Sequence, residues 1–280
     1  MIFDEKACVS TPPYNHKGFT LLVNPLRSVS RLLLGAHPTS ILPVQGGRTI
    51  PKEHRCGFTL AETLITLVIV GVVAALTVPT LITKYQKEQT VTKLKKVYSA
   101  LSQTTQKAIA DNGPINTWEI GEHASPEASK AFADKYLIPY LNVMKNCGND
   151  TSDECKFERI TRKPSNPTEL NEKYSRFFLN DGSLIGVYIY NKESLGVRAL
   201  IYIDINGQKK PNIVGRDYFE LSYNLVYPND TSLEGKFIPI GINKTREELK
   251  TSDCNKNNYG YHCFSLILKD GWQIKDDYPW

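Results

Sequence analysis

The sequence predicts an α+β fold in which one long N-terminal helix packs on a C-terminal antiparallel sheet. Residues 58–111 carry an unbroken helical pattern, which is apolar on all sides at first and amphipathic afterwards. Residues 175–227 carry short β-branched and aromatic segments separated by turn dipeptides. A long helix followed by hairpin-connected strands is typical of the α+β class.

Charge is distributed unevenly along the 280 residues. The whole chain has a formal net charge of +5, and residues 1–57 contain seven Lys or Arg against three Asp or Glu. The basic excess therefore lies just before the apolar segment, as expected for a segment held on the cytoplasmic side of a membrane. The nearly neutral remainder argues against a nucleic-acid-binding surface.

The apolar segment at residues 58–82 contains a single charged residue, Glu62. About 20 apolar residues suffice to cross a bilayer as a helix. A secretory signal cut near Ala74 and Ala75, a plain membrane anchor and a buried core helix are the alternatives. None of these requires the carboxylate, which costs about 2.5–3.5 kcal/mol at the centre of a bilayer.

A cut between Gly57 and Phe58 would explain why the apolar segment contains the carboxylate of Glu62. The cut would create an α-amino group on Phe58, one helical turn before Glu62. In a bundle of parallel helices staggered by about one turn, Glu62 of one copy could meet the amine of the next copy. The interpretation is that Glu62 sets the register of assembly.

The motif Gly-Phe-Thr-Leu-x-Glu at residues 57–62, followed by the apolar run and Pro79, resembles the N-terminal signature of type IV prepilins and type II secretion pseudopilins. The resemblance covers residues 55–109. It implies that a peptidase cuts after Gly57 and methylates the new N-terminal Phe58, and that Glu62 serves assembly. Pro79 matches the proline that bends the family's helix, and it also removes one helical hydrogen bond, which predicts a kink or local melting there.

The resemblance implies a structural subunit of a type IV pilus or of a type II secretion pseudopilus, polymerised through its N-terminal helix. The implied partners are copies of itself, related pilin-like subunits, prepilin peptidase, and an inner-membrane assembly platform with its ATPase. The subunit would cross the inner membrane once before assembly and then enter a periplasmic or cell-surface filament. The alternative is a membrane-anchored extracytoplasmic binding domain that borrows a prepilin-type signal.

Four regions follow from this interpretation: a cleaved leader at 1–57, a membrane and assembly segment at 58–82, an amphipathic helix at 83–113 and a head domain at 114–280. The leader is longer than those of the family. Either it is truly long, or translation begins at a non-AUG codon near Val44. An earlier Gly-Phe-Thr-Leu at 18–21 is followed by Pro25 and Arg27, so no spanning helix can form there.

The later elements are predicted from local signals. The long helix ends at Asp-Asn-Gly-Pro (111–114), and Ser125 and Pro126 open a short second helix. Polar residues 145–173 are predicted to form a loop. Strands are predicted at 175–180, 183–190, 197–205, 218–227 and 263–268, with Asp-Gly and Asn-Gly as turns, and residues 268–280 as a strand and extended tail covering the sheet.

Four cysteines follow the apolar segment, and Cys8 and Cys56 precede it. An even set outside the membrane indicates two disulfides, for which three connectivities exist. Disulfides between cysteines that lie close together in the sequence are favoured. Zinc is the alternative, but neither spacing matches the short ligand pairs of structural sites. The expected pairs are Cys147–Cys155 and Cys254–Cys263.

No catalytic motif is recognisable. His123 and His262 are isolated, and neither a nucleophile motif nor a phosphate loop is present. Oxygen ligands for calcium could come from Asp204, Asn206, Asn212 and Asp217. The distal glutamate of an EF-hand is missing there, and the Asn-Gly pair is explained as a turn. The expectation is therefore a protein without catalytic residues, bound metal or cofactor.

Overall fold

The computed structural model describes residues 59–280 except 157, 160–167, 170–172, 193–195 and 227–230. The chain separates into two units, Met1–Gly57 and Phe58–Trp280, and all described residues lie in the second. The predicted leader, Gly57 and Phe58 lie outside the described residues.

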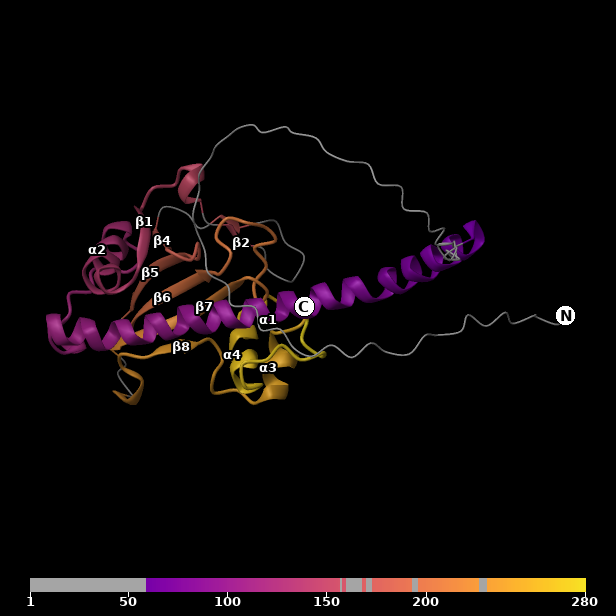
Figure 1. Cartoon of the computed structure of the whole chain (residues 1–280). Coiled ribbons are helices and arrows are strands. Elements are labelled where there is room, and N and C mark those ends of the chain that lie inside the picture. Colours follow the sequence, from indigo (N-terminus) through magenta and orange to yellow (C-terminus); the bar gives the residue numbers. More distant parts are fainter. Residues whose placement is uncertain (1–58, 157, 160–167, 170–172, 193–195, 227–230) are drawn as a thin grey trace, which may run out of the picture. The chain divides into compact units, whose positions relative to one another are not determined.

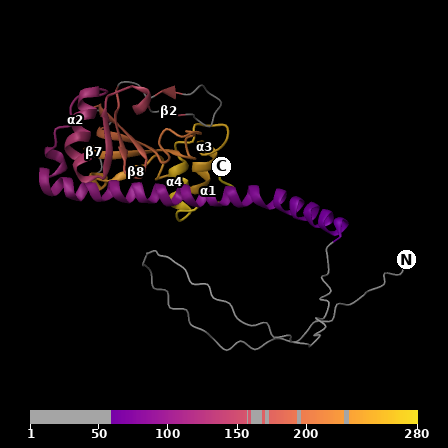
Figure 2. The same cartoon turned by 45° about the horizontal axis from the view of Figure 1, so that its top comes forward.

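One helix, α1 (Leu60–Asn112), dominates the fold. Its 53 residues correspond to a length of about 80 Å at 1.5 Å per residue. Gly113 ends it with φ +80° and donates its N–H to the carbonyl of Ile109. Figure 2 shows the second half of α1 running along the head while the first half projects beyond it.

The prediction of local melting at Pro79 is wrong, because α1 remains helical through this residue. A proline removes only one helical donor, and the rest of the ladder continues around it. Threonine hydroxyls also bond to carbonyls nearby: Thr77 to Val73 at 2.9 Å, and Thr83 to Pro79 at 2.9 Å. Such side-chain bonds help a membrane helix to tolerate proline.

The head contains a six-stranded antiparallel sheet in the order β1-β4-β5-β6-β7-β8. The hairpin predicted around Asp181-Gly182 is confirmed, because the strands on either side of it pair antiparallel. Asn206-Gly207 lies in a turn, as predicted, but the connection that follows β6 runs on to residue 217 before β7 begins. A two-stranded sheet joins β2 (Glu158–Arg159) to β3 (Thr168–Glu169). The main strands are β1 (Val143–Gly148), β4 (Ser175–Leu179), β5 (Leu184–Lys192), β6 (Gly196–Asp204), β7 (Tyr218–Val226) and β8 (Phe237–Pro239).

The core lies between α1 and one face of this sheet (Figure 1). The second half of α1 buries a stripe at helical spacing, including Leu94, Val97, Leu101 and Ala108. The ring of Tyr223 stacks on Phe237 with centroids 4.1 Å apart, and its hydroxyl accepts a hydrogen bond from Thr105 at 3.1 Å. The predicted amphipathic half is therefore confirmed as the packing half.

Two predictions about the head are wrong. Residues 263–268 are not a strand, because Cys263–Lys269 forms helix α4. A short, wholly apolar run does not reveal its period, and α4 buries almost its entire length next to β7. The predicted loop at 145–173 begins inside β1, which pairs with β4 despite its polar residues.

Two further helices and two disulfides lie in the head. Helix α2 (Pro126–Tyr136) begins at Ser125, whose hydroxyl accepts the N–H of Ala128, as predicted. Helix α3 (Arg246–Ser252) was not predicted, although Thr245 and Glu248 form a capping box at its start. The disulfides join Cys147 to Cys155 and Cys254 to Cys263, which are the two expected local pairs.

Candidate assembly site

The N-terminal end of α1 is closed by a reciprocal cap between Thr59 and Glu62. The Glu62 carboxylate accepts the backbone N–H and the hydroxyl of Thr59, each at 2.8 Å, and the Thr59 hydroxyl accepts the N–H of Glu62 at 3.2 Å. This capping box satisfies helix-end donors that have no partner inside the helix. The cap was not predicted, although Thr59 and Glu62 match the S/T-x-x-E motif of a capping box.

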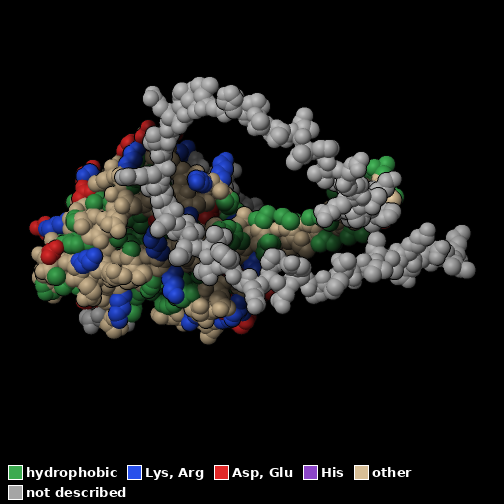
Figure 3. All heavy atoms as spheres, viewed as in Figure 1, with side chains coloured by type: hydrophobic (Ala, Val, Ile, Leu, Met, Phe, Trp, Pro, Cys, Tyr) green, Lys and Arg blue, Asp and Glu red, His purple; other side chains and the backbone are tan. Residues whose placement is uncertain are grey.

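The first half of α1 has no covering surface among the described residues. Leu60, Leu67, Leu76 and Leu81 are between 68% and 78% exposed. Figure 3 shows hydrophobic side chains along the projecting part of the helix. This helix is long and apolar enough to cross a membrane. Such a surface needs lipid or another protein around it.

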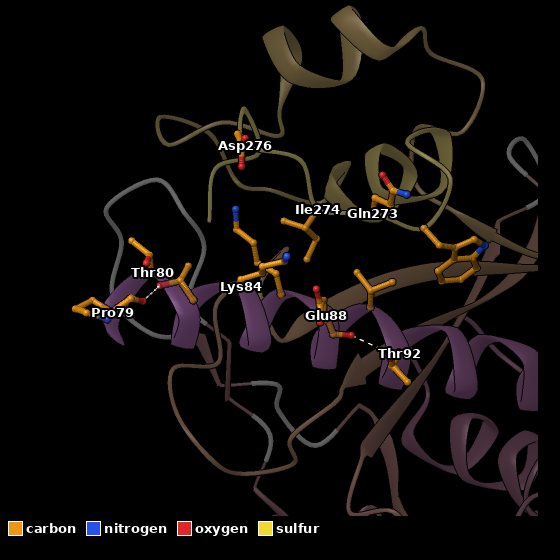
Figure 4. A pocket seen from close by; sticks show the side chains of 12 residues that line it. Pro79, Thr80, Lys84, Glu88, Thr92, Gln273, Ile274 and Asp276 are labelled. Atoms are coloured by element: carbon orange, nitrogen blue, oxygen red, sulfur yellow. Dashed lines mark hydrogen bonds between the residues drawn. The ribbon is translucent and has the colours of Figure 1, made fainter. Parts of the chain in front are cut away.

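A groove lies where the projecting half of α1 meets the head (Figure 4). One wall is α1 from Pro79 to Thr92, and the other is the C-terminal segment from Trp272 to Asp276. Its volume is about 930 Å³. Val91, Trp272 and Ile274 give it an apolar lining, and each of these side chains is half-buried.

Four charged residues also line this groove: Lys84, Lys87, Glu88 and Asp276. In Figure 4 the Lys84 side chain extends from α1 toward the segment that carries Ile274 and Asp276. Neither lysine forms a salt bridge within the described part of the chain. The groove therefore combines an apolar lining with two cations that have no ionic partner among these residues.

Trp272 is held firmly in the wall of the groove. The centroid of its ring lies 5.7 Å from that of Tyr98 and 5.9 Å from that of Phe264. The backbone N–H of Trp272 donates to the Ile267 carbonyl at 2.9 Å. The Lys95 ammonium lies 5.8 Å from the centre of the same ring. The wall is thus preformed by packing between the C-terminal segment and α1.

Arg246 fastens the C-terminal segment to α3. Its guanidinium binds both oxygens of Asp270, at 2.7 and 3.0 Å, and both oxygens of Asp277, at 2.9 and 2.8 Å. Lys250 adds a 2.8 Å contact to Asp277, and Lys275 adds one of 2.8 Å to Asp270. Hydrogen bonds from Arg246 and Lys250 lower the pKa of Asp277.

The strand predicted within residues 268–280 is not present in the structure. After α4 the chain forms turns and extended backbone with no further strand among its described residues, and it packs beside α3 and α1. Tyr278 donates its hydroxyl to the Gly215 carbonyl, and the Arg216 guanidinium lies 5.1 Å from the centre of the Trp280 ring. The tail is anchored at both ends.

The candidate calcium ligands do come together in the connection between β6 and β7. The Asp217 carboxylate accepts the backbone N–H groups of Asn212 and Ile213, at 2.8 and 2.6 Å, and the side-chain amide of Asn206 at 3.1 Å. Asp204 accepts the N–H of Asn206 at 3.1 Å. Burial raises the pKa of both carboxylic acids, and for Asp204 the charge of Asp217 adds to the effect.

These hydrogen bonds give the two aspartates a structural role, because they hold the backbone of the β6–β7 connection in place. Among the described residues, no group of three or more His, Cys, Asp or Glu side chains is placed to hold a metal ion. The expectation of a chain without bound metal stays a prediction.

The sheet face opposite α1 holds a buried carboxylate that the sequence did not reveal. Glu220 on β7 is only 13% exposed, and Arg159 lies 3.9 Å away. Burial raises the pKa of Glu220 to about 7, while the charges of Arg159 and Arg198 oppose this shift. Tyr202 and Tyr218 lie close to the same group.

Fold and N-terminal signal together define the class: a pilin-like α+β protein with a prepilin-type signal. Residues 53–78 match the model of the prokaryotic N-terminal methylation motif. Residues 80–280 match a family of unknown function, DUF6613, and the chain belongs to that family. No curated protein and no solved structure matches the chain.

Proposed function

We propose that this protein is a structural subunit of a membrane-rooted filament, either a type IV pilus or a type II secretion pseudopilus. The observation that carries the proposal is the match to the N-terminal methylation motif over residues 53–78, which includes most of an apolar, uncovered half-helix. A helix of this kind is stable in a membrane before assembly and within a bundle of like helices afterwards. The proposed role is structural, without catalysis.

The proposed processing is a cut between Gly57 and Phe58 by prepilin peptidase, followed by N-methylation of Phe58. Glu62 would then meet the new amine on a neighbouring copy, and Pro79 would adjust the course of the helix between the membrane and the head. Copies of this chain and related pilin-like subunits would be the partners in the filament. An inner-membrane platform and its ATPase would drive assembly, which moves the subunit into the periplasm or onto the cell surface.

The second candidate is a membrane-anchored extracytoplasmic binding domain that borrows the same signal. It is favoured by the reciprocal cap at Thr59, because this cap explains Glu62 within one chain. Shearing filaments from the native host, with and without its prepilin peptidase, separates the two candidates. The filament proposal expects the mature chain in the sheared fraction only when the peptidase is present. A mature chain found solely in the membrane favours the binding domain.

A further inference from the structure

We propose that the groove between α1 and the C-terminal segment is the docking site for the first three turns of α1 of a second copy. This inference rests on the proposed filament function and names the contact that the head makes in it. The two helices would be parallel, because copies inserted by the same signal face the same way in the membrane. The occupant is residues 60–70 of the second copy.

Size and chemistry agree with a half-embedded helix. Eleven residues span about 16 Å, and the α1 wall of the groove, residues 79–92, spans about 20 Å. The groove offers about 930 Å³. Its apolar lining, Val91, Trp272 and Ile274, suits the exposed apolar side chains of residues 60–70.

Charge fixes the register. Glu62 is the only charged residue of the apolar half, and Lys84 and Lys87 line the groove without an ionic partner among the described residues. Placing Glu62 beside Lys84 offsets the copies by 22 residues, or about 33 Å along the helix. Residues 60–70 then lie along 82–92, which is the groove wall.

The copy that offers Lys84 to Glu62 is not the copy that offers its Phe58 amine, because the two contacts require different offsets along the helix. A carboxylate has two oxygens and accepts several donors, so Glu62 can serve both neighbours at once. Glu62 and Lys84 are then paired inside the assembly, as charges removed from water require.

Filament yield measured on the full chain in its native host tests the proposal. Ile274→Glu replaces part of the apolar lining with a charge that repels Glu62, and we expect at least a tenfold loss of sheared filaments with membrane levels of the subunit unchanged. Met144→Glu is the matched control, since Met144 is an exposed apolar residue of β1, 62% accessible, away from the groove. It should leave the yield within twofold.

Cysteine cross-linking tests the register directly. Ala61→Cys with Thr83→Cys, a pair 22 residues apart, should give a ladder of cross-linked multimers in sheared filaments. Ala61→Cys with Gln103→Cys should give none. The four head cysteines are already bonded to each other.

The outcomes separate the two proposals. Wild-type chain that is processed but never enters filaments overturns the filament function itself. Normal filaments from Ile274→Glu, or a ladder only from the control pair, overturn the groove contact while the filament function stands. If Ile274→Glu lowers membrane retention instead of filament yield, the groove binds lipid and the inference is wrong. If the double-cysteine variant does not form filaments, the comparison of Ile274→Glu with Met144→Glu decides whether the groove contact exists.

Discussion

Glu62 and Thr59 form a reciprocal cap: the Glu62 carboxylate accepts two hydrogen bonds of 2.8 Å from Thr59, and the backbone N–H of Glu62 donates one of 3.2 Å to the Thr59 hydroxyl. Glu62 therefore has a role inside a single chain as well as the proposed role between chains. The capping role needs an acceptor at this position, whereas the assembly role needs a negative charge. The two roles can be separated by substitution.

Glu62→Gln should keep the cap and lose assembly. Glutamine also closes a capping box, so the helix start is preserved while the charge disappears. We expect Glu62→Gln and Glu62→Ala to be processed normally and to be absent from sheared filaments, as seen by immunoblot. Thr59→Ala, which removes the cap but keeps the charge, should assemble at a reduced level. Normal filaments from Glu62→Gln would show that Glu62 is only a cap.

Arg246→Ala should loosen the C-terminal segment. The Asp270 side chain is 1% exposed, and removal of the guanidinium leaves Lys275 as its only ionic partner among the described residues. We expect a loss of about 2 kcal/mol in the free energy of unfolding of the head, measured by denaturant titration. Arg246→Lys should recover part of it, because lysine keeps the charge but not the bidentate geometry.

The control for Arg246 is Lys145→Ala, which removes an exposed ion pair with Glu154. That pair should contribute less than about 0.5 kcal/mol. Equal effects of the two substitutions would contradict the importance assigned to Arg246.

Glu220 should make stability depend on pH. Burial raises its pKa to about 7 in the folded state, above the ordinary value of 4.5. The folded state then binds more protons than the unfolded state between these values, so stability falls as pH rises from about 4.5 to 7. One proton corresponds to at most about 1.4 kcal/mol per pH unit.

Thermal unfolding across this pH range checks the Glu220 prediction. Glu220→Gln should flatten the wild-type slope and raise stability at pH 7, because glutamine carries no charge to bury. Glu119→Gln, a change at an exposed carboxylate, should leave the slope as in wild type. An unchanged slope in Glu220→Gln would mean that Arg159 fully compensates the buried charge.

Removal of the second disulfide should destabilise the head. Cys254→Ala with Cys263→Ala frees the end of α3 from the start of α4, and both sulfurs lie in the core. For a closed loop of about ten residues we expect a loss of about 2–3 kcal/mol, seen in the urea midpoint. Reducing agent should lower the midpoint of wild type but not of a variant that lacks both disulfides.

The long helix, the hairpin at Asp181-Gly182 and both disulfide pairs could be predicted because each signal is local in the sequence. Turn residues, helix caps and nearby cysteines act over a few positions. The strand prediction at 263–268 failed because an apolar run without visible period fits a buried helix equally well. Local melting was wrongly expected at Pro79, because proline removes only one helical hydrogen bond and the bonds on either side of it remain.

The site was only half predictable for a similar reason. Gly57, Phe58 and Glu62 stand out as a linear motif, whereas the groove joins residues of α1 to Trp272 and Ile274 nearly two hundred positions later. The burial of Glu220 likewise depends on strands and a loop that converge only in the folded chain. Long-range packing carries no signature that a single sequence reveals.

The central claim is tested most directly by the intact mass and N-terminal sequence of the protein purified from membranes that contain a prepilin peptidase. We expect a chain that begins at N-methylated Phe58 and retains two disulfides. A chain that stays uncut, or that is cut near Ala75, would contradict it and leave a membrane-anchored or secreted head domain in place of a filament subunit.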